Sequence, residues 1–172
     1  MSQLGPYVDL RANPGRVPQV GPLFSPGRAA EISAGNRRVI VIDTETLKFK
    51  RMWGGYGNKP DDKDLGPYNP DAPPVQQFRL PHNVALSKAG LVYVADRVND
   101  RIQVFKRDGT FVREAFVAPK TLLAGSASGL AFSPDQRFVY VIDGANITSG
   151  FCCVRRCRSW ITSDSRVFSA DR

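Results

Sequence analysis

The chain has 172 residues, which is enough for one domain with a sizeable core. Hydrophobic residues make up 42% and charged residues 23%, as in an ordinary globular protein. No uninterrupted run of about 18 apolar residues occurs, so the sequence predicts no membrane-spanning helix. Residues 1–16 lack the apolar stretch of a secretory signal peptide, and the cellular location is left open.

The net charge of +8 raises the question of a nucleic-acid ligand. The excess lies mainly at the two ends, because residues 1–38 and 152–172 each carry a net +3 and residues 39–151 carry only +2. A nucleic-acid surface would need a basic stripe within the patterned middle of the chain. We therefore interpret the excess as solvated terminal charge and do not expect nucleic acid as a partner.

The three cysteines lie together at 152, 153 and 157. They lack the paired C-x-x-C spacing of a zinc site, and no histidine is near them. We expect neither a metal site there nor disulfides in the rest of the chain.

Short β-rich segments recur along the sequence. Val-Tyr-Val-Ala-Asp at 92–96 returns as Val-Tyr-Val-Ile-Asp at 139–143, and the segment 99–105 is echoed upstream at 36–42. Internal similarity of this kind is typical of repeat architectures such as propellers.

The best-preserved unit covers residues 78–116. It contains four short β-rich segments separated by turn signals, at 84–86, 91–95, 101–105 and 110–115. Four antiparallel strands in so short a length have the size of one propeller blade. The segment 92–95 is apolar on both faces, as expected for a strand sandwiched between neighbouring blades.

We therefore predict an all-β fold: a partial β-propeller with about three four-stranded antiparallel blades, one complete and two partial. Residues 1–35 are expected to be irregular, residues 36–146 to form the blades, and residues 147–172 to form an irregular tail with Arg and Cys. A proline-rich insertion at 57–77 is expected to be a surface loop. The abrupt change after about Asn146 is what a truncated gene or a shifted reading frame would produce.

The run from Val92 to Phe105, preceded by Pro81 and His82, resembles the NHL-repeat propellers, and the resemblance extends over roughly residues 36–143. It implies a six-bladed ring in a complete family member, of which this chain would be a fragment. The stretch 51–78 is similar to a bacterial group of exported NHL-type proteins, which implies an exported or periplasmic location for complete members.

Within that family the local sequence is similar to the peptidyl-hydroxyglycine amidating lyases. The resemblance implies that His82 would bind zinc beside two other histidines and that Arg97 would belong to the active site. His82 is the only histidine of the chain, so a three-histidine site cannot be assembled from it. We predict no catalytic residue and no cofactor; zinc or calcium would be expected only in a complete family member.

Five residues remain as candidates for a ligand-binding face: His82, Arg97, Asn99, Arg101 and Tyr68. Each also has a structural interpretation. His82 would bond to backbone at the start of a blade, Asn99 would cap its turn, and Arg101 would pair with Asp96 or Asp100. Tyr68 would pack on a blade edge.

The sequence thus favours a non-catalytic binding module for an unknown protein or saccharide. The alternative is an inactive remnant of a metal-dependent propeller enzyme, similar to an amidating lyase or a lactonase. RNA binding would need exposed aromatic residues, and Tyr93 and Tyr140 have the pattern of core residues. Open blade edges would also permit self-association.

Overall fold

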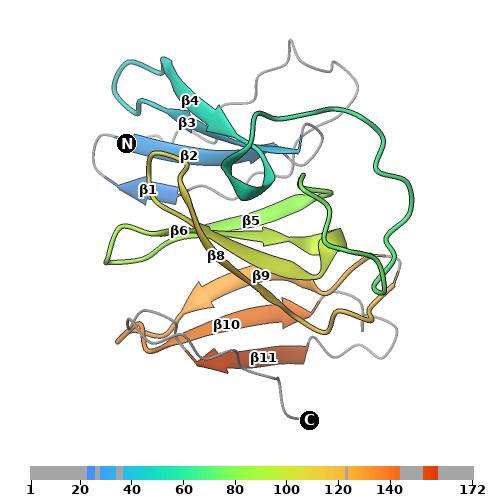
Figure 1. Ribbon diagram of the computed structural model, residues 1–172. Helices are drawn as coiled ribbons and strands as arrows, with labels where there is room; N and C mark the ends of the chain where they lie inside the picture. Colours follow the sequence, from blue (N-terminus) through green and yellow to red (C-terminus); the bar gives the residue numbers. More distant parts are fainter. Residues whose placement is uncertain (1–22, 26–27, 34–36, 123, 144–152, 159–172) are drawn as a thin grey trace.

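The computed structural model describes residues 23–25, 28–33, 37–122, 124–143 and 153–158. These residues form three antiparallel sheets that follow one another from top to bottom in Figure 1. The first sheet contains β1 (Leu23–Ser25), β2 (Arg28–Ser33), β3 (Arg38–Ile42) and β4 (Phe49–Trp53). The middle sheet contains β5 (Pro81–Leu86), β6 (Val92–Asp96), β7 (Arg101–Phe105) and β8 (Phe111–Phe116). The third sheet contains β9 (Ala127–Phe132), β10 (Phe138–Asp143) and β11 (Cys153–Arg158). Two 3-10 turns, η2 (Gly55–Gly57) and η3 (Arg97–Asn99), follow β4 and β6.

The middle sheet supplies the core on both of its faces. On β6, Val92 and Val94 pack with the first sheet, whereas Tyr93 and Ala95 pack with the third. Every residue of β6 and β7 is buried. Removing a side chain such as Val94 from water contributes about 1.5–3 kcal/mol, so these two interfaces are the main apolar support of the fold.

The two clusters are built from facing strands. The first joins the first and middle sheets through Val39, Val41, Trp53, Phe78, Val84, Val92, Val94 and Phe105. The second joins the middle and third sheets through Tyr93, Ala95, Ile102, Val104, Val117, Ala127, Val139 and Val141.

The order of the sheets is that of propeller blades. Each sheet runs up and down in chain order, and β5 contacts β2 of the first sheet and β9 of the third. Successive antiparallel sheets packed face to face, with neighbouring inner strands, are the arrangement of a β-propeller. The prediction of an all-β partial propeller is confirmed.

The turn between β7 and β8 shows why the hairpin forms where the sequence placed it. The Lys106 N–H donates to Thr110 O at 2.8 Å, and Asp108 Oδ1 accepts the Thr110 N–H at 2.9 Å. Gly109 has a φ of 95°, which a glycine adopts without steric cost. The turn therefore closes at the Asp-Gly pair.

Strands also form in two segments for which the sequence predicted irregular structure. Within residues 1–35, β2 pairs with β3 from Ala29 opposite Ile42 to Ser33 opposite Arg38. Within residues 147–172, β11 pairs with β10 along its whole length. In both cases backbone pairing satisfies the free edge of a strand that the sequence did predict, and such pairing needs no alternating apolar pattern. The first sheet thus has four strands and the third has three.

A long connection links β4 to β5. Residues 58–80 contain no strand or helix, and in Figure 1 this green segment passes along the right-hand side of the sheets. We call residues 57–77 the strap.

Candidate binding site

A buried ion pair lies where β6 ends and β7 begins. Asp96 is the last residue of β6 and Arg101 the first of β7, and η3 turns the chain so tightly between them that their side chains meet. Arg101 Nε donates to Asp96 Oδ2 at 3.0 Å, with the side chains 1% and 0% exposed. Asn99 Nδ2 donates to the same oxygen at 2.6 Å. The left-handed conformation of Asp100, with φ of 51°, completes this turn.

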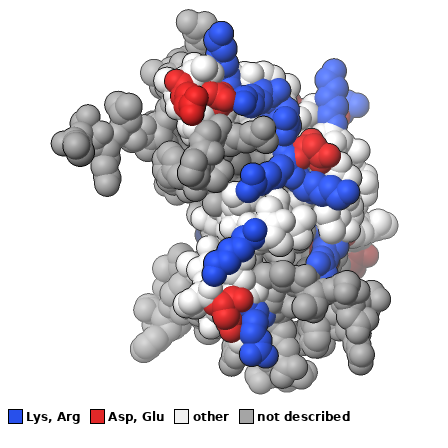
Figure 2. All heavy atoms as spheres, turned by 90° about the vertical axis from the view of Figure 1, so that its left-hand side faces the viewer, with Lys and Arg blue, Asp and Glu red and all other residues white. Residues whose placement is uncertain are grey.

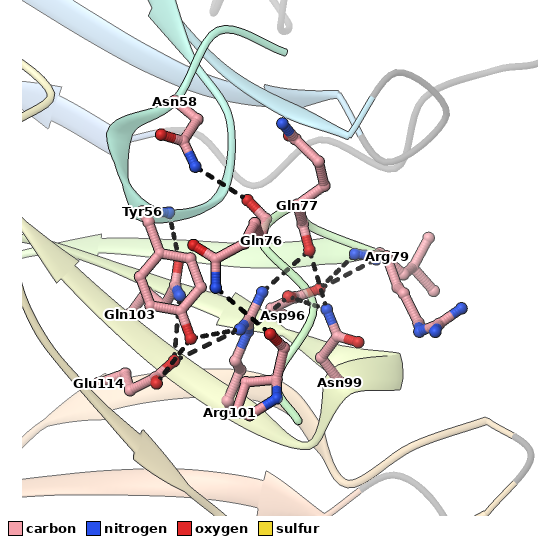
Figure 3. Close-up of polar contacts among 12 residues, drawn as sticks. Tyr56, Asn58, Gln76, Gln77, Arg79, Asp96, Asn99, Arg101, Gln103 and Glu114 are labelled. Atoms are coloured by element: carbon pink, nitrogen blue, oxygen red, sulfur yellow. Dashed lines mark hydrogen bonds and ion pairs between the residues drawn. The ribbon is translucent and has the colours of Figure 1, made fainter. Parts of the chain in front are cut away.

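The same carboxylate fixes the two residues before β5, directly after the strap, to the middle sheet. Asp96 Oδ1 accepts the backbone N–H groups of Arg79 and Leu80 at 2.9 and 3.0 Å. The Gln77 carbonyl accepts Arg101 Nη2 at 2.9 Å and Asn99 Nδ2 at 3.2 Å. Figure 3 shows these bonds converging between Gln77, Asp96 and Asn99. The strap therefore ends at a fixed position.

On the other side of Arg101, η2 reaches across from the first sheet. Tyr56 Oη donates to Glu114 Oε1 at 2.7 Å, and Arg101 Nη1 donates to Tyr56 Oη at 3.0 Å. The Arg101 guanidinium carbon also lies 5.0 Å from the centre of the Tyr56 ring, a cation–π distance. Burial, and then the hydrogen bond to Glu114, raise the pKa of Tyr56 to about 12, so its hydroxyl stays protonated.

Gln103 completes this group of polar side chains. Its Nε2 donates to Glu114 Oε2 at 3.1 Å, and its Oε1 accepts the Tyr56 N–H at 3.0 Å. Arg101 Nη1 lies 3.4 Å from Glu114 Oε2. Arg101 is thus compensated by two carboxylates and bonded at all three of its nitrogens, which makes it a structural residue.

The strap is also held along its length. The Arg79 guanidinium donates to the carbonyls of Leu65, at 3.1 Å, and Gly66. Tyr68 Oη donates to Pro119 O at 2.8 Å, which joins the strap to the segment after β8. Gln77 Nε2 donates to Lys59 O at 3.0 Å and closes the base of the strap.

A pocket of about 460 Å³ lies between the strap and the middle sheet, and we call it the strap pocket. This volume is in the range of small-ligand sites. The strap side is formed by Leu65, Pro67, Tyr68, Asn69, Pro70, Ala72, Pro73, Pro74 and Val75. The opposite side is formed by Arg79, Asn99, Arg101, Phe116 and Pro119.

The structure brings together three of the five ligand-face candidates. Tyr68, Asn99 and Arg101 all line the strap pocket, although Tyr68 comes from the strap and the others from the turn after β6. Arg101 forms its pair with Asp96, whereas the Asp100 carboxylate accepts the Ser126 N–H at 2.6 Å.

His82 and Arg97 lie elsewhere. His82 Nδ1 donates to Ser128 O at 2.6 Å and so links β5 of the middle sheet to β9 of the third. The Arg97 N–H donates to Leu80 O at 2.9 Å. Neither residue lines the strap pocket.

Arg79, Phe116 and Pro119 line the pocket and were not singled out from the sequence. Arg79 stands directly before β5, and Phe116 ends β8. The sequence offers no local signal for them, because the strap that brings them together is irregular.

The zinc site implied by the family resemblance does not fit these residues. In the part of the chain that the structure describes, no group of three His, Cys, Asp or Glu side chains is placed to hold a metal ion. The one histidine is hydrogen-bonded to a backbone carbonyl.

Comparison with known proteins agrees with the repeated β-rich pattern of the sequence. The NHL repeat model matches residues 78–105, which contain β5, β6 and β7. The middle sheet is therefore the part of the chain that is similar to the NHL-repeat family. Human NHL repeat-containing protein 3 is 38% identical over 65 residues, which are 38% of this chain and 18% of the human protein.

Two solved structures are also similar to this chain. Hydrazine synthase of Kuenenia stuttgartiensis superposes with a TM-score of 0.51 at 16% identity, covering 80% of this chain and 32% of that one. The β-propeller domain of Swd1 from Myceliophteria thermophila gives a TM-score of 0.47 at 13% identity, covering 74% and 33%. The chain thus spans about a third or less of these relatives, and the first structure bears on the fold alone.

No helix among the described residues is long and apolar enough to cross a membrane.

Proposed function

We propose that this chain is a non-catalytic interaction module that binds a protein segment in the strap pocket. NHL-repeat propellers generally act as protein-interaction modules. The observation that carries the proposal is the pocket itself: a volume of about 460 Å³, bounded by a strap fixed at both ends and at Tyr68.

The lining of the pocket favours an apolar segment of chain. Four prolines of the strap face Phe116 and Pro119 across the pocket. Prolines present rigid apolar surface that loses little conformational entropy on binding. The amide of Asn99 and the hydroxyl of Tyr68 add a small number of polar groups, as is usual in ligand pockets.

The same lining supports a non-catalytic role. The lining residues include no carboxylate, imidazole, thiol or aliphatic hydroxyl that would serve as a general base or nucleophile near neutral pH. Burial raises the pKa of Tyr68, so its phenol stays protonated. Arg101 already uses its three nitrogens on Asp96, Tyr56, Glu114 and Gln77.

A saccharide is the less favoured ligand. A sugar presents many hydroxyl groups, each of which needs a hydrogen-bond partner when it leaves water. Most lining residues are prolines or other apolar residues without side-chain polar atoms.

Peptide titration tests the proposal. The isotope-labelled full chain is titrated with sets of short proline-rich, aromatic and aliphatic peptides, and with chito- and malto-oligosaccharides, and amide shifts are mapped by NMR. We expect a subset of peptides to shift residues of the strap, η3 and the end of β8. Shifts that map elsewhere, or a pocket that responds to the sugars and to no peptide, would overturn the proposal.

A pair of matched variants checks the location. Ala72 is exposed on the strap side of the pocket, and Ala89 is exposed in the turn between β5 and β6. Ala72→Trp is expected to weaken peptide binding at least about tenfold by occupying the pocket, and Ala89→Trp to leave it unchanged. Equal effects of the two variants would place the ligand outside the strap pocket.

The alternative of a metal-dependent enzyme is tested separately. Calorimetric titration of the purified chain with Zn²⁺ and with Ca²⁺ is expected to show no stoichiometric binding. Stoichiometric zinc binding that is lost in His82→Gln would favour the enzyme instead.

A further inference from the structure

Among the described residues that line the strap pocket, one cation forms no salt bridge with a carboxylate. Arg101 is compensated by Asp96 and Glu114. Arg79 also lines the pocket, but among the described residues its guanidinium bonds only to the carbonyls of Leu65 and Gly66. A carbonyl accepts a hydrogen bond without neutralising the charge.

The position of Arg79 makes this charge costly. Burial lowers its pKa, which means that the surroundings disfavour the charged form. Its Nε is buried and has no hydrogen-bond partner in the described part of the chain. A guanidinium has five N–H donors, and the two bonds to the strap leave one N–H on each terminal nitrogen for a ligand.

Asn99 supplies an acceptor on the same side of the site. Both N–H groups of its amide are used, on Asp96 Oδ2 and on Gln77 O. Its Oδ1 has no hydrogen bond in the described part of the chain, so it is free to accept a ligand N–H. In Figure 3 the Arg79 and Asn99 side chains extend to the same side of the polar group.

We propose that the strap pocket binds an apolar group carrying a free carboxylate, with the carboxylate on Arg79. The C-terminal residue of a peptide has the full set of matching groups: a carboxylate for Arg79, a backbone N–H for Asn99 Oδ1 and a side chain for the proline-lined wall. This proposal rests on the proposed function and specifies which end of a protein segment enters the pocket.

The sharpest test changes the ligand and leaves the protein intact. The full chain is titrated with acetyl-Ala-Ala-Leu as the free acid and as the C-terminal amide, with shifts mapped by NMR. We expect the acid to bind at least about tenfold more tightly, because a charge-assisted bond replaces a neutral one. Equal affinities at the pocket would overturn the carboxylate proposal while leaving the proposed function intact. Internal peptide segments that bind the pocket while both tripeptides fail would do the same.

The NMR shifts must be mapped onto the structure because Lys and Arg side chains also gather on another face of the protein. Figure 2 shows Lys and Arg side chains outnumbering acidic ones on the face that lies on the left of Figure 1, away from the strap. Acid-dependent shifts confined to that face would also overturn the proposal.

Two variants identify the cation. Arg79→Gln keeps an N–H donor for the strap but removes the charge, so it should abolish the preference for the acid; Arg79→Lys should keep most of it. Lys106→Gln, in the turn at the far end of β7, removes the same charge away from the pocket and should change nothing. An acid preference that survives Arg79→Gln would assign the charge recognition to another residue and overturn the role of Arg79.

A small acid distinguishes the source of the carboxylate. 4-Methylpentanoate offers the same apolar body and charge without a peptide N–H. Tighter binding of the tripeptide acid supports a chain terminus as the ligand, whereas tighter binding of the small acid would overturn that form and support a free carboxylic acid.

Discussion

Asp96 and Arg101 form a salt bridge of 3.0 Å that is almost completely removed from solvent and bound to three parts of the chain at once. Through Asp96 it holds Leu80 just before β5, through Arg101 it holds Tyr56 of η2, which follows the first sheet, and through both it fixes the turn of η3. The pair therefore joins two sheets and orders the pocket-side end of the strap.

Removal of the Asp96 carboxylate is expected to destabilise the folded protein strongly. Asp96→Ala leaves Arg101 Nε and the N–H groups of Arg79 and Leu80 without their acceptor in a buried site, and should lower the free energy of unfolding by about 3–5 kcal/mol. Urea denaturation followed by circular dichroism measures this. Lys63→Ala is the control, since its pair with Asp61 spans 4.0 Å with side chains 85% and 44% exposed, and its cost should stay within about 0.5 kcal/mol. Similar costs for the two variants would refute the structural role of the buried pair.

Ionisation of the Tyr56 hydroxyl should destabilise the folded protein at alkaline pH. Its pKa is about 12 in the folded protein against an ordinary value of 10.0 for tyrosine, so the folded state binds the proton more tightly. The stabilisation is complete below about pH 10 and is lost as the pH rises toward 12. The urea midpoint of the wild type should therefore fall more steeply between pH 9 and about pH 11.5 than that of Tyr56→Phe. Parallel pH profiles would contradict this.

The bond from Tyr68 to Pro119 should limit the motion of the strap. Tyr68→Phe removes one hydrogen bond and should cost about 0.5–1.5 kcal/mol. Trypsin should then cut faster after Lys63 within the strap, as followed by mass spectrometry. Tyr140→Phe is the matched control, because no hydrogen bond of its hydroxyl is found in the described region. Unchanged cleavage in Tyr68→Phe would show that the strap is held without this contact.

Substitution of two glycines by alanine distinguishes the free-energy cost of a left-handed backbone from the cost of a steric clash. Both have positive φ, 75° at Gly125 and 61° at Gly66, but an added Cβ at Gly125 would lie 2.0 Å from the Arg97 carbonyl oxygen, whereas at Gly66 it would meet nothing within 4 Å. Gly66→Ala should cost about 1–2 kcal/mol for its left-handed backbone. Gly125→Ala should cost at least about 1–3 kcal/mol more because of the clash. Thermal unfolding of both variants measures the two losses of stability. Equal losses would mean that the segment before β9 does not approach η3 this closely.

The repeated sequence pattern predicted the middle sheet well because its two central strands, β6 and β7, are buried on both faces. Val92 to Ala95 are buried whichever way they point, so the segment is apolar throughout and easily recognised. β2, with Arg28, Glu31 and Ser33, lacks that pattern, and β11 contains Arg155, Arg156 and Arg158. These two strands form because β3 and β10 each offer a free edge for backbone pairing. The residues of β2 and β11 alone do not reveal that edge.

The site was predicted only in part for a related reason. Asp96, Asn99 and Arg101 lie within six consecutive positions, so their association follows from one turn. Tyr56 lies 45 residues before Arg101, and Tyr68 lies 51 residues before Pro119. Their meeting depends on the course of the strap, which has no periodic pattern to predict it.

The contact of Tyr56 with Arg101 shows that the unit built around the middle sheet begins before the first strand of that sheet. The middle sheet begins at Pro81, yet the groups that complete its buried polar cluster, Tyr56 and the Gln77 carbonyl, precede that strand and belong to η2 and the strap. A dissection of the chain just before Pro81 would sever Arg101 from two of its acceptors and open the cluster to water. The smallest self-sufficient unit is therefore offset toward the N-terminus and must carry η2 and the whole strap with the sheet.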